Sequence, residues 1–432
     1  MKIPTIIVYS PTAQKILLMK IRIYSPSSSL ASLAYPWSRH LNDWPESCFV
    51  DVPRGIHRNV VKFIKYQDSV YVLKELRTHV AKKELANLHK LEELGLPVVN
   101  SVGLVEKRDE AVEEASNEFT QEIPEIKDMF DRGLLITKYL DGSLPYRVII
   151  ERGINYTRLE QMLDSLAQLL VRLHLVGFYW GDCSFSNALF KRDAGLLTAF
   201  LVDAETGEFH QKLSKGQREY DLELAHLNIA GDLMDLEAHC GLPNDADPVD
   251  LVDSLVSKYH YFWAQLTDPI EIGAKEQYKI DQFIERINTQ GYDIGELEID
   301  TIERGTRLLV KPVNVEPGFN RKQLQKLTGL VVGENQAKRL LQDIHRYQPY
   351  VSQLGQRQLS IGSAARRWLI DIYQTSLDMI AIELRDQLDD AEVFHEILEH
   401  RWYISEHQKK DIGTIEATKS YVLLQLKLKG QS

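Results

Sequence analysis

The sequence predicts an α+β protein with a small β-rich lobe, a helical lobe and an additional, mostly helical C-terminal domain. Short apolar runs separated by turn residues gather in the first third of the chain, as is typical of antiparallel strands. Apolar residues at helical spacing dominate from Leu159 onward. A length of 432 residues corresponds to two or three domains of ordinary size.

The changes of pattern along the chain give the expected boundaries. The opening stretch is rich in Ser, Pro and aromatic residues without a clear period, and Met1 and Met19 are alternative starts of translation within it. The expected segments are 1–47, an irregular lead-in; 48–250, a domain with lobes of about 48–140 and 141–250; and 255–432, the C-terminal domain.

Five strands and one helix are expected in the β-rich lobe. The helix, about 80–94, carries Leu85, Leu88 and Leu91 on one face and ends at Gly95. An acidic insert before the last strand is expected to be a solvated surface loop. The expected strands are 48–52, 60–66, 70–76, 98–105 and 133–139.

The rest of the chain is expected to be largely helical. A helix with Leu at helical spacing from Leu159 to Leu173 should end near Gly177, and two short strands, 188–190 and 198–202, should follow. A hairpin over 296–315 should turn at Arg304-Gly305. The remaining expected helices are 218–236, 248–266, 275–290, 321–328, 334–347, 361–384 and 390–400.

Composition excludes several classes of function. The formal net charge of −11 disfavours nucleic acid as a partner, because binding to phosphates needs a basic face. The three cysteines are far apart in sequence, which argues against a disulfide framework and a structural zinc site. No apolar run is long enough to span a membrane, and polar residues interrupt the N-terminal apolar run. We therefore expect a cytoplasmic protein.

Chemistry is concentrated in five acidic, amide and basic side chains. Asp182 and Asn187 lie in the loop after the long helix, and Asp203 ends the strand Phe200-Leu201-Val202. Upstream, Lys74 lies late in a strand and Glu84 on the following helix. Phosphoryl transfer requires such a set, because phosphate charge must be neutralised, magnesium held and a hydroxyl aligned.

Each side chain has an expected role in that chemistry. Lys74 would reach the α- and β-phosphates of ATP while Glu84 holds it in place. Asp203 would ligate Mg²⁺ with a hard oxygen, and Asn187 would offer an amide oxygen to a second ion. Asp182 would orient the hydroxyl and accept its proton.

These residues stand in an order that resembles the protein-kinase-like superfamily, in its lipopolysaccharide-kinase and aminoglycoside-phosphotransferase-like branch. Leu173-His174-x-x-Gly177 followed by Gly181-Asp182 is similar to a segment of those kinases. The resemblance implies a bilobal protein-kinase-like fold, with a small antiparallel-sheet lobe and a helical lobe. It also implies that the backbone around Thr137, Tyr139 and Leu140 holds the adenine of ATP.

The whole chain from about residue 20 resembles an uncharacterised bacterial family that joins a kinase-like N-terminal half to a C-terminal domain of unknown function. The segments 217–221, 327–330 and 395–402 carry this second resemblance. It implies no known substrate, and it leaves the C-terminal domain as a possible contact for a protein partner.

The sequence departs from the kinase pattern in three places. The loop that should be glycine-rich, 54–59, contains only Gly55, and basic side chains such as Arg58 would have to replace backbone contacts to phosphate. Trp180 stands where a His usually precedes the catalytic Gly-Asp or Arg-Asp. Ala204-Glu205 replaces Phe-Gly after the metal Asp, and Glu205 is a candidate further metal ligand.

Other polar residues have simpler interpretations. Cys183 is expected to be a small buried loop residue, since no His has motif spacing to it. Asp221 is expected to cap the helix that it opens, although it could also support the catalytic loop. The acidic and His side chains at 395–400 match neither common zinc motif and are expected to form a structural cluster.

The sequence is compatible with three functions. The first is an ATP- and Mg²⁺-dependent phosphotransferase acting on a hydroxyl of a sugar, small molecule or protein. The second is a nucleotide-binding pseudokinase that signals through its C-terminal domain, and the third is a scaffold without phosphoryl transfer. The single glycine in the phosphate loop favours the second, whereas retention of Lys74, Asp182, Asn187 and Asp203 favours the first.

Overall fold

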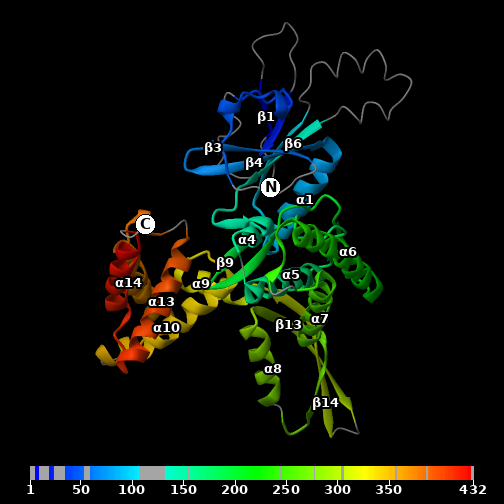
Figure 1. Ribbon diagram of the computed structural model, residues 1–432. Coiled ribbons are helices and arrows are strands. Elements are labelled where there is room, and N and C mark those ends of the chain that lie inside the picture. The colour runs from blue at the N-terminus through cyan, green and yellow to red at the C-terminus, as the bar shows by residue number, and fades with distance from the viewer. Residues whose placement is uncertain are drawn as a thin grey trace, which may run out of the picture. The chain divides into compact units, whose positions relative to one another are not determined.

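The computed structural model in Figure 1 is a mixed α+β protein whose chain divides into two units. The first unit consists of Met1–Phe190 and Ala199–Lys258, and the second of Lys191–Thr198 and Tyr259–Ser432. The structure describes residues 5–8, 19–23, 35–52, 59–106, 132–153, 155–243, 246–276, 278–302, 306–355, 358–385 and 388–429. The acidic insert expected after the fourth strand lies outside the described residues.

A six-stranded antiparallel sheet forms the β-rich lobe of the first unit, in the order β1-β2-β5-β6-β4-β3. β4 is central to the later argument, because it pairs with β3 on one side and β6 on the other. The strands are β1 (Thr5–Val8), β2 (Met19–Ile23), β3 (Val60–Tyr66), β4 (Ser69–Arg77), β5 (Ser101–Glu106) and β6 (Arg132–Lys138).

Two features of this sheet correct the sequence prediction. The expected strand 48–52 is absent, and a 3₁₀ turn, Glu46–Cys48, precedes it; Val50 donates one backbone hydrogen bond to Phe63. The lead-in 1–47, expected to be irregular, supplies β1 and β2. These strands extend the sheet beyond β5, whose free edge would otherwise expose unpaired backbone groups. Trp37, Leu41 and Trp44 pack in one buried cluster with sheet residues.

One helix, α1 (Thr78–Glu93), begins directly where β4 ends and packs against β4, β5 and β6. Its apolar face buries Leu85, Leu88 and Leu91, as the leucine spacing predicts. Gly95 follows with a φ of 74°, and its amide closes a helix-terminal turn onto the Glu92 carbonyl.

The helical lobe of the first unit is built around α5 (Tyr156–Leu175), whose side chains from Leu159 to Leu173 are almost all buried. Asn155 caps its first turn by accepting a hydrogen bond from the Arg158 amide. The other elements that lie wholly in the first unit are β7 (Ser143–Pro145), α4 (Tyr146–Glu151), β8 (Phe178–Tyr179), β11 (Glu208–Phe209) and α6 (Lys215–Cys240). Three further elements begin or end in the first unit and are divided between the two units: β9 (Ala188–Asp193), β10 (Leu196–Leu201) and α7 (Pro248–Thr267).

The second unit is mostly helical apart from a three-stranded sheet in the order β12-β14-β13. The two strands of the expected hairpin are present as β13 (Tyr292–Ile302) and β14 (Arg307–Pro317), which pair antiparallel. The turn expected at Arg304-Gly305 lies outside the described residues. Its other elements are β12 (Ile270–Gly273), α8 (Tyr278–Thr289), α9 (Phe319–Thr328), α10 (Glu334–Leu354), α11 (Ile361–Trp368), α12 (Thr375–Asp378), α13 (Asp390–Gln408) and α14 (Thr414–Lys429). The helix expected over 361–384 is instead interrupted by a π-helical segment, Leu369–Gln374.

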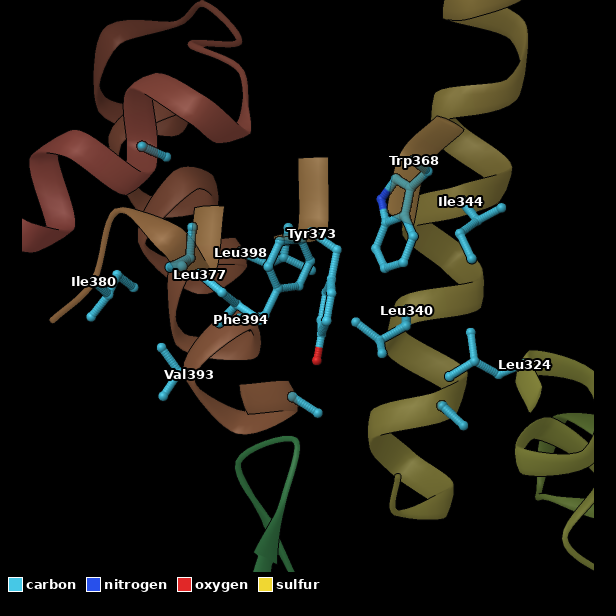
Figure 2. Close-up of a cluster of buried hydrophobic side chains, with 14 of the residues drawn as sticks. Leu324, Leu340, Ile344, Trp368, Tyr373, Leu377, Ile380, Val393, Phe394 and Leu398 are labelled. Atoms are coloured by element: carbon cyan, nitrogen blue, oxygen red, sulfur yellow. The ribbon is translucent and has the colours of Figure 1, made fainter. Parts of the chain in front are cut away.

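An aromatic group centres the core of the second unit (Figure 2). The ring of Phe394 lies 5.6 Å from that of Trp368 and 4.9 Å from that of Tyr373, measured between centroids. Leu340 and Ile344 of α10 belong to the same buried cluster. This core joins α10, the π-helical segment and α13 into one packed body.

The turn between β9 and β10 is part of this second unit. The carboxylate of Asp193 accepts hydrogen bonds from the amides of Asn335, at 3.1 Å, and Gln336, at 2.7 Å, in the first turn of α10. The carboxylate of Glu392 on α13 accepts from the amides of Ala194, at 2.7 Å, and Gly195, at 2.9 Å. Asp193 and Glu392 are almost fully buried, so these bonds are shielded from water.

Candidate functional site

A cavity of about 350 Å³ in the first unit contains most of the residues singled out by sequence. Its walls come from β3, β4 and β6, from the segment after β6 and from the loop between β8 and β9. The sequence-predicted residues that line it are Lys74, Glu84, Thr137, Tyr139, Leu140, Asp182, Asn187, Asp203 and Glu205. Two further candidates, Gly55 and Arg58, lie outside the described residues.

Lys74 is surrounded by three carboxylates at the back of the cavity. Its Nζ lies 3.0 Å from Glu84 Oε2, 2.5 Å from Asp203 Oδ2 and 3.6 Å from Glu205 Oε2. The ten-residue separation of Lys74 and Glu84 suffices because α1 follows β4 without a loop. The expected strand-to-helix ion pair is therefore present in the structure.

The charges of this cluster are not balanced. Burial alone would lower the pKa of Lys74, but the adjacent charges of Glu84 and Asp203 outweigh it and raise that pKa. Burial raises the pKa of Glu84, and so does the charge of Asp203, against the opposing effect of Lys74. The pKa of Glu205 is raised as well, first by burial and then by Asp203. The single ammonium group of Lys74 thus lies among three carboxylates, and the cluster carries an excess of negative charge.

The carboxylate oxygens that carry this negative charge lie close enough together to bind a cation. Single oxygens of Glu84, Asp203 and Glu205 lie within 4.8 Å of one another. Among the described residues this is the group of acidic, His or Cys side chains placed to hold a metal ion. Carboxylate oxygens are the ligands that Mg²⁺ prefers, so the donor set fits that ion.

Asp182 and Asn187 meet within the loop between β8 and β9. The side-chain amide of Asn187 donates to the backbone carbonyl of Asp182 at 2.9 Å and to its Oδ2 at 3.0 Å. The Val202 amide donates to the Asn187 carbonyl at 3.1 Å, which fixes the loop beside the residue that precedes Asp203. The two loop residues and Asp203 therefore line one cavity.

Sequence reasoning missed Asn228 on α6. Its side-chain amide donates to Asp182 Oδ1 at 3.0 Å and to the Cys183 carbonyl at 3.3 Å. With Asn187 on Oδ2, both oxygens of the Asp182 carboxylate are held by amide donors. The only sequence signal was spacing, because Asp221, Asn228 and Asp232 are seven and four residues apart and share a helix face.

Asp221 supports the loop rather than capping a helix, which corrects the preferred sequence interpretation. Ser214 caps α6, so Asp221 lies inside the helix and is fully buried. Its carboxylate accepts hydrogen bonds from the amides of Trp180 and Gly181, both at 2.8 Å, and pairs with His174 Nε2 at 3.0 Å. Three buried polar groups just before Asp182 thus depend on one carboxylate.

The third α6 residue, Asp232, holds the other end of the loop. It accepts hydrogen bonds from the amide and hydroxyl of Ser186, at 3.3 and 3.1 Å, and from the Tyr146 hydroxyl at 3.3 Å. The Tyr146 ring stacks on Phe185 with centroids 5.5 Å apart. Asp221, Asn228 and Asp232 therefore contact the start, middle and end of the loop.

The segment after β6 offers backbone groups to the cavity. The Tyr139 amide donates to the Val70 carbonyl at 2.9 Å, and the Leu140 carbonyl accepts from Ser143. Among the described residues, the Leu140 amide and the Tyr139 carbonyl make no backbone hydrogen bond. These two groups flank one trans peptide bond and point in opposite directions, so one of them can face the cavity and contact a purine ring. Thr137, on β6 itself, is buried in the sheet.

Two other sequence candidates stay outside the chemistry. Cys183 is fully buried, and burial raises the pKa of its thiol well above the ordinary value, as expected for a packed loop residue. His395 lies 3.3 Å from Glu399, and His400 Nε2 lies 3.0 Å from the Ser420 hydroxyl. His395 and His400 thus have different neighbours.

Comparisons with known proteins match two parts of the chain to families. Residues 54–230 match the model described as the lipopolysaccharide kinase (Kdo/WaaP) family, and residues 261–426 match a domain of unknown function, DUF4032. A solved structure described as WaaP in complex with acyl carrier protein covers 50% of this chain and 90% of that chain, with 15% identity and a TM-score of 0.31. None of the curated proteins matches the chain. No helix among the described residues is long and apolar enough to span a membrane.

Proposed function

We propose that this chain, which joins a kinase-like domain of the lipopolysaccharide kinase family to a domain of unknown function, transfers the γ-phosphate of ATP to a hydroxyl group with the help of Mg²⁺. The observation that carries the proposal is the convergence of Lys74, Asp203, Asp182 and Asn187 on one cavity from three separate segments: β4, the loop between β8 and β9, and the residues after β10. The proposed use of ATP favours a cytoplasmic location.

The nucleotide would occupy the cavity along its length. The backbone of the segment Tyr139-Leu140, which lines the cavity, would bind the adenine edge. Lys74, which the surrounding carboxylates keep protonated, would contact the phosphates. Asp203 and Glu205 are two of the three carboxylates placed to hold a metal ion, and Asn187 lines the same cavity. These three residues would hold Mg²⁺, which supplies the charge neutralisation that phosphoryl transfer needs.

Asp182 would act on the acceptor. In the transfer step the acceptor oxygen forms a bond to the γ-phosphorus while the bond between that phosphorus and the β,γ-bridging oxygen breaks. The hydroxyl proton passes to the Asp182 carboxylate, and ADP leaves with the electron pair of the broken bond. The amides of Asn187 and Asn228 fix both carboxylate oxygens and so aim this base.

A competing function is nucleotide sensing without transfer, which the unusual phosphate loop of the sequence favours. The two functions share nucleotide binding and differ in turnover. An experiment that measures both quantities in the same variants separates them.

Nucleotide affinity tests the binding half of the proposal. Calorimetric titration and thermal shift with ATP, with and without Mg²⁺, should show binding that depends on the ion, with a stabilisation of about 2.7 kcal/mol at a hundredfold excess over Kd. Asp203→Asn should weaken the Mg²⁺-dependent part, because it removes an anionic ligand. Asp235→Asn, on the exposed face of α6, is the matched control and should change nothing.

Release of the γ-phosphate, to water or to a panel of hydroxyl acceptors, tests the transfer half. Asp182→Asn should leave nucleotide affinity nearly intact and slow turnover by about 10²–10⁴-fold, the usual contribution of a general base. Binding without turnover in the wild-type chain would instead establish the sensor. Turnover that survives Asp182→Asn would remove this residue from the mechanism.

A further inference from the structure

A second cavity, of about 320 Å³, lies within the C-terminal unit between α10 and α13. Arg339, Gln342, Asp343 and Arg346 line it from one face of α10, because they are three and four residues apart. Leu398, Arg401, Trp402 and Ser405 line it from α13, and Asp411 from the turn that follows. Three arginines therefore line one cavity whose volume suits a small ligand.

One of the three arginines is fully engaged. Arg401 forms a two-pronged pair with Asp411, with its Nε 3.0 Å from Oδ1 and its Nη2 2.6 Å from Oδ2. Its Nη1 donates to the Thr414 hydroxyl at 3.0 Å and lies 3.6 Å from Asp343. Asp343 in turn accepts a hydrogen bond from the Trp368 indole at 2.7 Å. Both acidic side chains of the cavity are therefore paired within the protein.

The other two arginines retain unused donors. The Nε of Arg339 is buried without a hydrogen-bond partner, and among the described residues Arg339 has no ion pair. Arg346 is exposed. Its charge helps to lower the pKa of Asp411, but the Asp411 carboxylate is already bound by Arg401. Arg339 and Arg346 both line the cavity, and an oxygen-rich anion from solution would compensate the charge of their guanidinium groups.

An aromatic surface adjoins these arginines. Trp402 is 63% exposed although it lines the cavity, so its indole offers a flat apolar face to a ligand. Gln342 and Ser405 add polar groups to the same rim. Guanidinium groups match phosphate oxygens in geometry as well as charge, and indole rings stack on other planar rings.

We propose that this cavity binds a small phosphate ester that carries a planar ring, such as an aryl phosphate or a nucleoside monophosphate. Its phosphate contacts Arg339 and Arg346, and its ring stacks on Trp402. A simple anion would use the arginines but leave the indole exposed, whereas an uncharged ring would leave the buried Arg339 donor unpaired. The combination of both features selects the class of ligand.

Calorimetric titration of the full chain with phenyl phosphate tests the site. Phenyl phosphate should bind at least about tenfold more tightly than inorganic phosphate, and phenol should not bind, because each lacks one of the two groups. Arg339→Gln and Arg346→Gln should each weaken phenyl phosphate by about tenfold or more. Lys338→Gln, a neighbouring change on α10 outside the cavity lining, should leave the affinity unchanged.

The fluorescence of Trp402 separates a nucleotide from a simpler aryl phosphate. AMP should quench the wild-type chain more than it quenches Trp402→Phe, and the difference between the two chains isolates Trp402, because a nucleotide bound in the first unit, near Trp180, acts on both chains alike. Quenching by phenyl phosphate but not by AMP restricts the site to small aryl phosphates. Absence of phenyl phosphate binding in the folded chain, or binding that survives the exposed-site change Arg346→Gln together with Trp402→Ala, would overturn the proposal.

Discussion

At the scale of single residues, Asp221 shows how one buried carboxylate can set a loop. It is fully buried, and its two oxygens serve two backbone amides and one imidazole, which come from separate positions of the chain. Buried polar groups depend on their partners, because an unpaired donor keeps the cost of leaving water. Removing Asp221 therefore affects three groups at once.

Asp221→Ala should destabilise the first unit by about 3 kcal/mol, the scale of breaking a buried charged pair. For a unit of this size that corresponds to a fall in melting temperature of about 6–12 °C. Glu223→Gln, on the exposed side of the same helix, should change the melting temperature by less than about 2 °C. An unchanged melting temperature in Asp221→Ala would show that the carboxylate is not needed for the loop.

Single residues also show what sequence reasoning can reach. Lys74, Glu84, Asp182, Asn187, Asp203 and Glu205 were named from motif order, and the structure brings them to one cavity. Their chemistry was readable because phosphoryl transfer restricts residue types at fixed places in the chain. Gly55 and Arg58 remain predictions. Asn228 could not be named, because an Asn in a helix has no distinctive type or motif.

At the scale of elements, α6 acts as a support for the catalytic loop. Three side chains on one of its faces each contact a different part of the loop. Asp221 binds the amides of Trp180 and Gly181. Asn228 binds Asp182, and Asp232 binds Ser186. A helix is rigid over this distance, so the three contacts keep the loop in register. Asn228 is the contact that reaches the proposed base itself.

Asn228→Ala should leave nucleotide affinity unchanged and lower the rate of γ-phosphate release by about tenfold or more, because a hydrogen bond to a charged group is lost. Leu227→Ala, the exposed neighbour on the same helix, is the matched control. Affinity comes from titration and the rate from phosphate release. An equal loss in nucleotide affinity and in rate would indicate a general distortion of the cavity rather than a loss of the orientation of the Asp182 carboxylate.

Elements were predicted well where a local pattern sufficed. The leucine spacing of α1 and α5 predicted both helices, and a hairpin predicted over 296–315 corresponds to β13 and β14. Strands β1 and β2 were missed because they join the sheet only through the pairing of β2 with β5, which is distant in sequence. The segment 48–52 has strand-like composition but finds no continuous partner, so composition gave the wrong result.

At the scale of the whole molecule, the turn between β9 and β10 connects the C-terminal unit to the site along the chain itself. Asn187 immediately precedes β9, and Asp203 follows β10 by two residues. The tip of the same hairpin, Lys191–Thr198, belongs to the second unit. Sequence could not show this, because the contacts of the tip join residues about 140 to 200 positions apart.

A substitution of Glu392 tests whether the contact between α13 and the β9–β10 turn affects the site. It lies on α13, outside the kinase-like segment, and its carboxylate holds the amides of Ala194 and Gly195. Glu392→Ala should free the tip and let Asn187 and Asp203 move more widely at the base of the hairpin. We expect weaker Mg²⁺-dependent ATP binding and slower γ-phosphate release, each by several-fold, because the metal ligands are then less well placed.

Hydrogen exchange decides whether the effect travels through the hairpin. Amides of residues 188–202 should exchange faster in Glu392→Ala, while those of α5 should keep their protection. Glu406→Gln, an exposed change on α13, should alter neither exchange nor affinity. Faster exchange at the tip with wild-type Mg²⁺-ATP affinity and turnover would mean that the site holds its geometry without the second unit. The domain of unknown function would then be joined to the kinase-like domain without positioning it.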